Sequence, residues 1–170
     1  IRYAKEALRY VTPKNQERAW RLEGNIACQS FKYYEARDVF MKLEKWALHQ
    51  QNKYLLQYSY MGMQRAISMG LADERLQKAD YPELEQAMKE YVQKGITLAK
   101  EMGNLEYITQ AYSRLANFYN NFEQPKEAIH HYELALQLAE QYGCRKDLEK
   151  DNYLHLYENS KLTGDFEKAL

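Results

Sequence analysis

Glycine and proline are scarce in this chain of 170 residues, which contains seven glycines and three prolines. An all-β domain of this length needs a turn about every ten residues, and these two residue types supply most turns. Long hydrophobic runs are also missing, and the mean hydropathy is -0.78, which excludes a membrane-spanning helix. These absences favour an all-α chain that does not insert into a membrane.

A net charge of one sign is missing as well, because 24 Lys and Arg residues balance 24 Asp and Glu residues. This balance argues against a dedicated nucleic-acid-binding protein, which normally presents a strongly basic face. The charge is uneven along the chain, with a net excess of basic residues over 1–21 and of acidic residues over 72–90. Opposed patches of this kind can steer a partner or favour self-association, and solvated helix faces are the alternative interpretation.

Catalytic and metal-binding patterns are absent too. The two cysteines, Cys28 and Cys144, lie far apart in sequence and neither has a second Cys or a His at metal-ligand spacing, which argues against a disulfide framework or a zinc site. Of the four histidines, His130 and His131 are adjacent, so on a helix they diverge by about 100° and cannot chelate one ion together. No nucleophile triad, paired acid set or phosphate loop occurs. We therefore predict a protein that is not an enzyme and needs no cofactor or metal.

What the chain does contain is a long-range repeat of helical segments. Apolar residues recur with helical spacing in almost every window. In addition, an aromatic residue, in most copies with Gly or Ala four positions later, opens segments at Trp20, Tyr58, Tyr112 and Tyr153. Separations of about 40 residues or more indicate stacked helix pairs rather than one closed core. We expect helices at about 1–10, 16–30, 33–50, 53–69, 82–102, 106–121, 125–142, 146–162 and from 166 onward.

These residues resemble the tetratricopeptide repeat, a helix-turn-helix unit with the pattern aromatic-x2-Leu-Gly-x2-Tyr, then Ala, an aromatic, Ala and Pro. The best copy, 109–142, places Tyr112, Leu115, Ala116, Tyr119, Ala128, Tyr132 and Ala135 on signature positions. The resemblance implies an all-α, right-handed superhelical solenoid. It forms a single repeat domain over 1–170, with a partial repeat at 1–13, repeats at about 17–50, 55–102 (with an insertion at 70–81) and 109–142, and a truncated repeat at 150–170.

The scarce residues fit this pattern. Gly24, Gly62 and Ala116 are small where the two helices of a repeat must approach closely. Gly70, Gly103 and Gly143 follow helical segments, where a left-handed cap is expected, and Pro82 and Pro125 stand where second helices begin. Of the 16 tyrosines, we expect five to fill core positions with their hydroxyl groups reaching the rim: Tyr58, Tyr112, Tyr119, Tyr132 and Tyr153.

In the tetratricopeptide family, ligands usually lie in the concave groove lined by the first helix of each repeat. The corresponding positions here are Arg18, Arg21, Asn25, Gln29, Ser59, Met63, Gln110, Ser113, Arg114, Asn117, Asn120, Asn121 and Glu158. Amide side chains both donate and accept hydrogen bonds, as recognition of a peptide backbone requires. A merely solvated helix face is the alternative.

Part of this set resembles the carboxylate clamp with which some family members grip a peptide C-terminus. Arg21, Asn25 and Arg114 fit, but Tyr60 stands where the clamp needs Asn and Gln110 where it needs Lys. The insertion at 70–81 is a second candidate contact, with Leu71 to Leu76 forming an extra turn at the corner of a helix pair. Its alternative is a solvated bend.

The predicted function is that of a non-catalytic scaffold that binds a protein or peptide, with no nucleic-acid partner. The long repeat resembles the repeat-built sensor regions of bacterial sensor histidine kinases and regulators, so we expect the sensory or interaction region of a larger signalling protein. The alternatives are a cytoplasmic peptide-responsive regulator of an attached output domain and a homo-oligomerisation module, with a homodimer as its simplest form. The compartment would be periplasmic for a sensor kinase ectodomain and cytoplasmic otherwise. We expect the chain to be cut from a longer protein.

Overall fold

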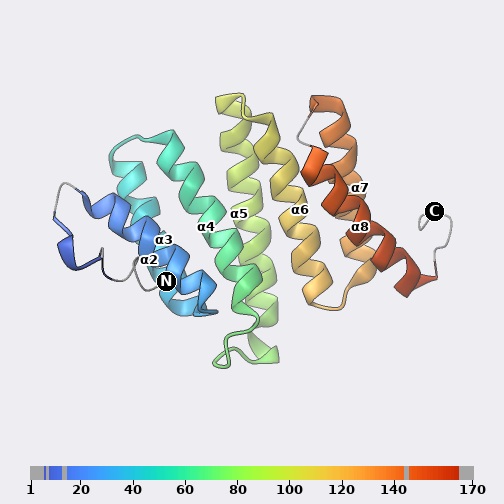
Figure 1. Cartoon of the computed structure of the whole chain (residues 1–170), viewed down its shortest axis with the longest axis horizontal. Helices are drawn as coiled ribbons and strands as arrows, with labels where there is room; N and C mark the ends of the chain where they lie inside the picture. Colours follow the sequence, from blue (N-terminus) through green and yellow to red (C-terminus); the bar gives the residue numbers. More distant parts are fainter. Residues whose placement is uncertain (1–5, 7, 13–14, 144–145, 165–170) are drawn as a thin grey trace. The chain divides into compact units, whose positions relative to one another are not determined.

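The structure, a computed structural model, describes residues 6, 8–12, 15–143 and 146–164 (Figure 1). This part of the chain is helical and contains no strand, which confirms the all-α prediction. The α-helices are α2 (Gln16–Gln29), α3 (Tyr33–His49), α4 (Lys53–Gly70), α5 (Tyr81–Met102), α6 (Leu105–Asn121), α7 (Pro125–Tyr142) and α8 (Lys146–Thr163), with short 3-10 helices at η1 (Leu8–Tyr10) and η3 (Lys78–Asp80).

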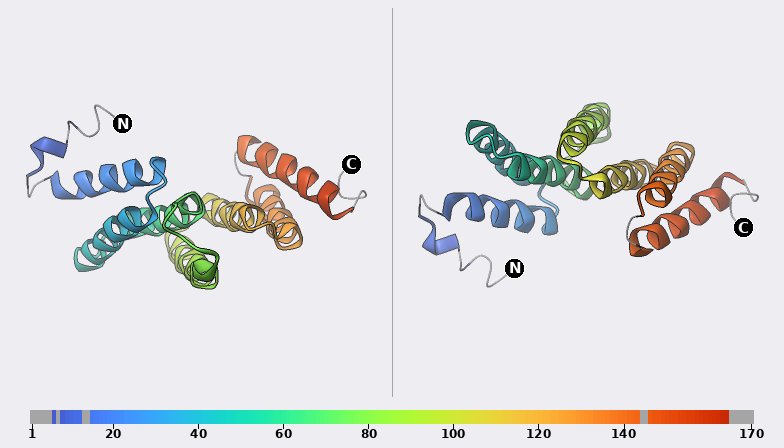
Figure 2. Two further views of the ribbon diagram at one scale, coloured as in Figure 1. Left: turned by 90° about the horizontal axis from the view of Figure 1, so that it is seen from below. Right: turned by 90° about the horizontal axis from the view of Figure 1, so that it is seen from above.

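The chain divides into two compact units, residues 1–91 and residues 92–170, with the boundary inside α5. In the first unit α2 packs on α3, α3 packs on α4, and α2 also contacts α4. In the second unit α6 packs on α7, α7 on α8, and α6 also contacts α8; Figure 2 shows α7 and α8 side by side. Contact of a helix with the next helix and with the one after it is the packing of stacked helix pairs.

The helix positions follow the sequence pattern closely. The helices α2 to α8 begin and end within one residue of the predicted bounds, and Pro125 is the first residue of α7. At the N-terminus a helix was expected over 1–10, and the structure shows the 3-10 helix η1 there among the described residues. The helix expected from 166 onward lies outside the described residues.

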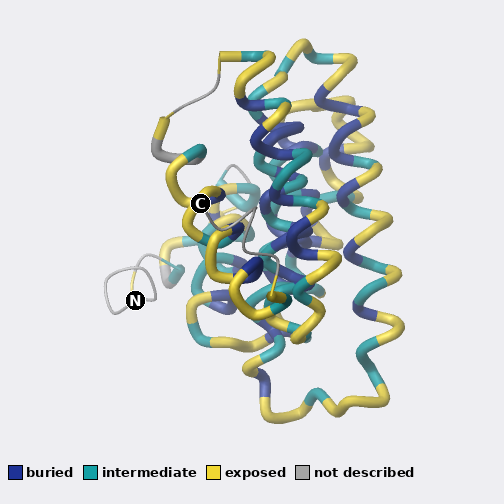
Figure 3. Tube along the Cα trace, turned by 90° about the vertical axis from the view of Figure 1, so that its right-hand side faces the viewer, coloured by how far each residue is buried: buried dark blue, intermediate teal, exposed yellow. Residues whose placement is uncertain are grey.

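Close approach of α2, α3 and α4 depends on two glycines. The ring of Phe40 on α3 is fully buried and lies against both Gly24 on α2 and Gly62 on α4. A Cβ atom at Gly24 would stand 2.6 Å from the ring, and one at Gly62 would be closer still. Gly24 therefore has the predicted role, because it lets the two helices of one repeat approach closely. Gly62 also makes room for the Phe40 ring, but that ring belongs to the second helix of the preceding repeat. Figure 3 shows the buried residues gathered where helices face one another.

Three of the tight turns share one backbone form in which a residue other than glycine is left-handed. Phe31, Gln51 and Glu123 have φ values of 54°, 50° and 55°. Each directly precedes a residue whose N–H donates back to the carbonyl five positions earlier; for example Asn52 N donates to Ala47 O at 2.9 Å. This is the helix-ending motif that normally takes glycine.

Two glycines have the predicted capping role and one does not. Gly103 and Gly143 are left-handed, with φ of 68° and 63°. Gly70 is instead the last residue of α4 and is buried against Tyr33, where a Cβ atom would stand 2.7 Å from the Tyr33 Cβ. The prediction of a left-handed cap at Gly70 was therefore wrong, because α4 needs a small residue there for packing.

The five tyrosines expected in the core divide into three groups. Tyr119 and Tyr132 are buried as predicted, Tyr58 and Tyr112 are partly buried, and Tyr153 is 61% exposed. The prediction for Tyr153 was wrong because α8 is rotated relative to the expected register. Its buried face consists of Asn152, Leu156, Asn159 and Ser160, and its exposed face carries Tyr153, Leu154, Tyr157 and Leu162.

None of the helices in the described part is both long enough and apolar enough to span a bilayer. Cys28 is a buried free thiol, and burial raises its pKa to about 11. A thiol with so high a pKa is a weak nucleophile at neutral pH. Cys144 lies outside the described residues.

Candidate functional site

A cavity of about 170 Å³ lies between α2 and α4, the first helices of the repeats predicted at 17–50 and 55–102. Helix α2 contributes Glu17 and Arg21. Residue Asn52, which caps α4, and three residues of α4 complete the lining, and these three are Tyr54, Leu55 and Tyr58. We call this space, with the side chains that border it on α2 and α4, the α2–α4 groove.

Tyr58 is held from two sides in the α2–α4 groove. The guanidinium carbon of Arg21 lies 4.3 Å from the centre of the Tyr58 ring, a cation–π geometry. Asn25 Nδ2 donates a hydrogen bond of 2.9 Å to the Tyr58 hydroxyl oxygen. Both partners come from α2, one helical turn apart, so the ring and its hydroxyl group are fixed before any ligand arrives.

Asn25 connects this tyrosine to a second arginine of α4. Arg65 Nη1 donates to Asn25 Oδ1 at 3.4 Å, and Arg65 Nε lies 3.5 Å from the sulfur of Met69. Arg65 is seven residues after Tyr58, which places it two turns further along the same side of α4. The groove therefore carries polar side chains in the order Arg21, Tyr58, Asn25 and Arg65.

The rest of the groove is open to solvent. Tyr54 is 80% exposed, although large aromatic side chains are normally buried. Arg21 is exposed and approaches Glu17 only at 3.7 Å, with both side chains well exposed. Exposed ion pairs of this length contribute little stability, so Arg21 can exchange this partner for a ligand.

The predicted groove residues of the first unit fall into two sets. Arg18, Arg21 and Gln29 are exposed and Asn25 is partly buried, all on α2. Ser59 and Met63 on α4 are buried, and Ser59 Oγ donates to the backbone oxygen of Leu56 at 2.7 Å. Ten of the 18 residues of α4 are buried, so these two motif positions do not face an accessible surface.

In the second unit most of the predicted residues bond to their own neighbours. Gln110 Nε2 donates to Glu106 at 2.9 Å, and Arg114 Nη2 lies 3.5 Å from Gln110 Oε1. Ser113 is buried and donates to the backbone oxygen of Thr109 at 3.1 Å. These three residues all lie on α6. Because Ser113 is buried and already bonded to the backbone, it is not available to a ligand.

Asn117 is engaged inside the second unit as well. The hydroxyl group of buried Tyr132 donates to Asn117 Oδ1, and the His155 ring stacks on Tyr132 with 5.5 Å between centres. Burial raises the pKa of Tyr132 well above its usual range. Asn120 is partly buried, and Asn121 and Glu158 are exposed. The α2–α4 groove is thus the better-defined part of the predicted site.

Sequence reasoning did not select Tyr54 or Arg65, and it treated Tyr58 as a core residue. The motif positions indicate which faces of the first helices are accessible. Tyr58 occupies the aromatic signature position of the repeat, where we expected the side chain to be buried in the core. In the structure Tyr58 is partly exposed, and its hydroxyl group accepts a hydrogen bond from Asn25 across the groove. No local pattern around Arg65 indicates that its side chain reaches α2.

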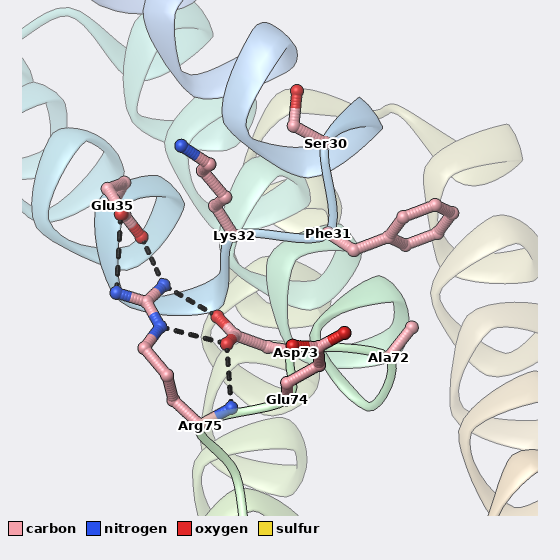
Figure 4. Close-up of a pocket in the computed structure, with 8 residues that line it drawn as sticks. All are labelled: Ser30, Phe31, Lys32, Glu35, Ala72, Asp73, Glu74 and Arg75. Atoms are coloured by element: carbon pink, nitrogen blue, oxygen red, sulfur yellow. Dashed lines mark hydrogen bonds and ion pairs between the residues drawn. The ribbon is translucent and has the colours of Figure 1, made fainter.

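A larger cavity, of about 470 Å³, lies at the corner where the α2–α3 turn meets the segment after α4 (Figure 4). Its lining is Ser30, Phe31, Lys32, Glu35, Ala72, Asp73, Glu74 and Arg75. In Figure 4 the guanidinium group of Arg75 lies between the carboxylates of Asp73 and Glu35. The distances are 2.9 and 2.7 Å from Nε and Nη2 to the two Asp73 oxygens, and 3.3 and 2.5 Å from Nη1 and Nη2 to the two Glu35 oxygens.

Asp73 also caps α3 from outside that helix. Its Oδ2 accepts a hydrogen bond of 2.8 Å from the backbone N–H of Tyr33, the first residue of α3. Hydrogen bonding from the Arg75 side chain, with further bonds from the backbone N–H groups of Arg75 and Tyr33, lowers the pKa of Asp73 to about 2. The insertion at 70–81 is therefore fixed to the α2–α3 turn, and after Gly70 it consists of turns and η3 rather than a projecting helix.

The charged side chains of this corner cavity bind one another. Arg75 already binds two carboxylates of the protein, and Glu35 has a lowered pKa because of the Arg75 hydrogen bond. Its strongest charges are mutually satisfied, unlike those of the α2–α4 groove. Among the residues that the structure describes, no group of three or more His, Cys, Asp or Glu side chains is placed to hold a metal ion.

Together the fold and the groove define a helical-repeat protein of the tetratricopeptide-like kind, with a polar groove between first helices. No family model matches the chain, and no curated protein sequence matches it. Seventeen chains of solved structures do match. One is the crystal structure of the apo form of RapI, a helical-repeat protein, with a TM-score of 0.66 and 16% sequence identity.

The RapI match covers 99% of this chain and 57% of the RapI chain. At this identity the similarity establishes the fold alone, and it confirms that the chain is a helical-repeat solenoid. The chain spans little more than half the length of RapI.

Proposed function

We propose that this chain is a non-catalytic scaffold that binds a peptide or an extended protein segment in the α2–α4 groove. The observation that carries the proposal is the arrangement of Arg21, Asn25 and Tyr58. Their side chains are fixed by contacts of 4.3 and 2.9 Å across two helices, and Arg21 and Tyr58 line a cavity beside exposed Tyr54. Preorganised polar groups lower the entropy cost of binding.

A peptide fits the chemistry of the groove. Asn25 and Tyr58 are hydrogen-bonding side chains of the type that pairs with backbone amides, and Tyr54 offers an aromatic surface at low conformational cost. The match to a protein crystallised in an apo form supports a ligand-binding role by analogy of fold. The same proposal predicts that the groove residues expected on α6 and α8 also take part in binding.

The test is a selection of dodecamer peptides from a random display library on the immobilised chain. Synthetic versions of the selected peptides are then measured by fluorescence anisotropy. We expect Arg21→Ala and Tyr58→Ala to weaken binding at least tenfold. Lys42→Ala, which changes an exposed residue of α3, is expected to leave affinity unchanged. Equal affinities for all three variants, with unchanged melting temperatures, would contradict the proposal.

The wider role that we propose is the sensory or interaction region of a larger signalling protein, because the long repeats resemble those of bacterial sensor kinases and regulators. A peptide-responsive regulator of an attached output domain is the alternative. The flanking coding sequence separates them. A transmembrane helix followed by a kinase domain supports the sensor, and a DNA-binding or other output domain supports the regulator.

Self-association is a separate candidate that one observation favours. Four large apolar side chains, Tyr153, Leu154, Tyr157 and Leu162, are exposed on α8, and exposed apolar patches mark interaction surfaces. Sedimentation equilibrium at micromolar concentrations tests this candidate, with Leu154→Lys as the disrupting variant. A monomer at all concentrations would exclude it.

A further inference from the structure

Arg65 differs from Arg37 and Arg75, two other arginines of the first unit. Arg37 pairs with Asp38 at 2.9 Å, and Arg75 pairs with Asp73 and Glu35. Arg65 is partly buried, and within the described part of the chain it forms no ion pair. A partly buried guanidinium group normally pairs with a carboxylate. Among the described residues, no carboxylate pairs with Arg65.

The contacts that Arg65 does make leave much of its donor capacity unused. Its two contacts, with Asn25 Oδ1 at 3.4 Å and the Met69 sulfur at 3.5 Å, are long and involve Nη1 and Nε. A guanidinium group has five N–H donors in a rigid fork. Among the described residues, nothing accepts from Nη2. These contacts orient the side chain toward α2 without neutralising it.

A second cation lines the same groove. Arg21 stands over the Tyr58 ring, whose hydroxyl group accepts the hydrogen bond of Asn25. The cavity lining holds one cation, Arg21, and one carboxylate, Glu17, so Arg65 adds beside it a positive charge that the lining does not balance. Such an excess steers acidic ligands toward the groove.

We propose that Arg65, oriented by Asn25 and assisted by Arg21, forms an anion subsite that receives the side-chain carboxylate of an Asp or Glu residue in the bound peptide. This inference rests on the proposed peptide-binding function and specifies its ligand class. The planar fork of Arg65 suits a carboxylate. A free peptide C-terminus fits less well, because Tyr60, at the position where a carboxylate clamp needs Asn, is buried.

The test uses the peptides selected from the random library, synthesised with an amidated C-terminus. We expect these peptides to be enriched in Asp and Glu. Replacing the critical Glu of a peptide by Gln should weaken binding to the unchanged protein about tenfold. The same replacement should cost nothing with Arg65→Gln, because the partner of the carboxylate is then missing. Arg65→Lys should keep part of the preference, since it retains the charge.

Arg37→Gln is the matched control, because Arg37 lies on α3 and has its own partner. It should show the full tenfold preference for the acidic peptide. If peptides bind and Arg21→Ala or Tyr58→Ala weakens them, but the acidic and amide peptides bind equally, the anion subsite is wrong while the proposed function stands. If binding instead requires a free C-terminal carboxylate, the subsite is also wrong. If no variant of the groove weakens binding, the proposed function itself fails.

Discussion

The ring of Phe40 on α3 lies so close to Gly24 on α2 that a Cβ atom on the glycine would stand 2.6 Å from the nearest ring carbon. Real Cβ contacts are not that short, so the Phe40 ring or one of the two helices has to shift if the glycine gains a side chain. Gly62 on α4 approaches the same ring, and a Cβ atom there would be closer still. Phe40 therefore locks three helices together and fixes the position of α2 beside α4.

We expect Gly24→Leu to lower the free energy of unfolding by about 1–3 kcal/mol through overpacking against Phe40. Urea unfolding followed by circular dichroism measures the change. Gln29→Leu is the control, because Gln29 is exposed on the same helix and should change stability by less than about 0.5 kcal/mol. A neutral result for Gly24→Leu would show that α2 and α3 do not meet at this residue.

Asp73 makes stability depend on pH in the acid range. Its pKa is about 2 in the folded chain and 3.8 when unperturbed, so its contribution is fully present above pH 4. That contribution is lost as the pH falls from about 4 to 2, because the folded state must then take up a proton that breaks the bond to Arg75. We expect Asp73→Asn to lower the melting temperature at pH 7. We also expect the variant to lose less stability between about pH 4 and 2, in the acid limb of a plot of melting temperature against pH.

Glu74→Gln is the control for this prediction, because Glu74 is exposed beside Asp73 and Figure 4 draws no hydrogen bond between Glu74 and the other lining residues. Its acid limb should match that of the unchanged protein. Identical pH profiles for Asp73→Asn and the unchanged protein would show that the contacts of Asp73 with the α2–α3 turn do not stabilise the fold.

Gln51 is a residue at which glycine should be better than the natural side chain. Its φ of 50° is left-handed, which costs a residue with a Cβ atom about 1 kcal/mol. We expect Gln51→Gly to raise the free energy of unfolding by about 0.5–1 kcal/mol. Gln50→Gly, with a right-handed φ of -83°, should lower it. A loss of stability in both variants would contradict the turn geometry.

Helix α8 buries polar side chains that lack partners. Asn152 is 2% exposed, and its Nδ2 has no hydrogen-bond partner among the described residues. An unsatisfied buried donor costs about 1–3 kcal/mol, and leucine has the same number and branching of side-chain heavy atoms as asparagine. We therefore expect Asn152→Leu to raise the melting temperature, whereas Asp151→Leu at the exposed neighbouring position should not. A lower melting temperature for Asn152→Leu would show that the amide is bonded in solution.

The sequence predicts the helices and their pairing well because that information is local or periodic. Aromatic and small residues recur at fixed offsets, and Gly24 and Gly62 follow from that pattern together with their partner Phe40. Proline at the start of α7 is likewise a local signal. The accessible side of α2, with exposed Arg21 and partly buried Asn25, follows from the same register.

Other features depend on contacts between distant residues, which one sequence does not reveal. Asp73 caps Tyr33 across 40 residues, and Arg65 reaches Asn25 across 40 residues. Both separations match the repeat length of about 40 residues, but the repeat pattern predicts which helices are neighbours and not which polar side chains pair. The rotation of α8, which exposes Tyr153 and buries Asn152, is set by packing on α6 and α7 and runs against the hydrophobic pattern.

The most direct test of the account is an NMR titration of the 20.3 kDa chain with a peptide selected from the display library. Peptide binding in the α2–α4 groove predicts shifts in the side-chain amide of Asn25 and in the Nε–H resonances of Arg21 and Arg65. Backbone shifts should follow along α2 and the first three turns of α4. Shifts confined to α8, or to the corner around Arg75, with the Asn25 amide unmoved, would contradict it.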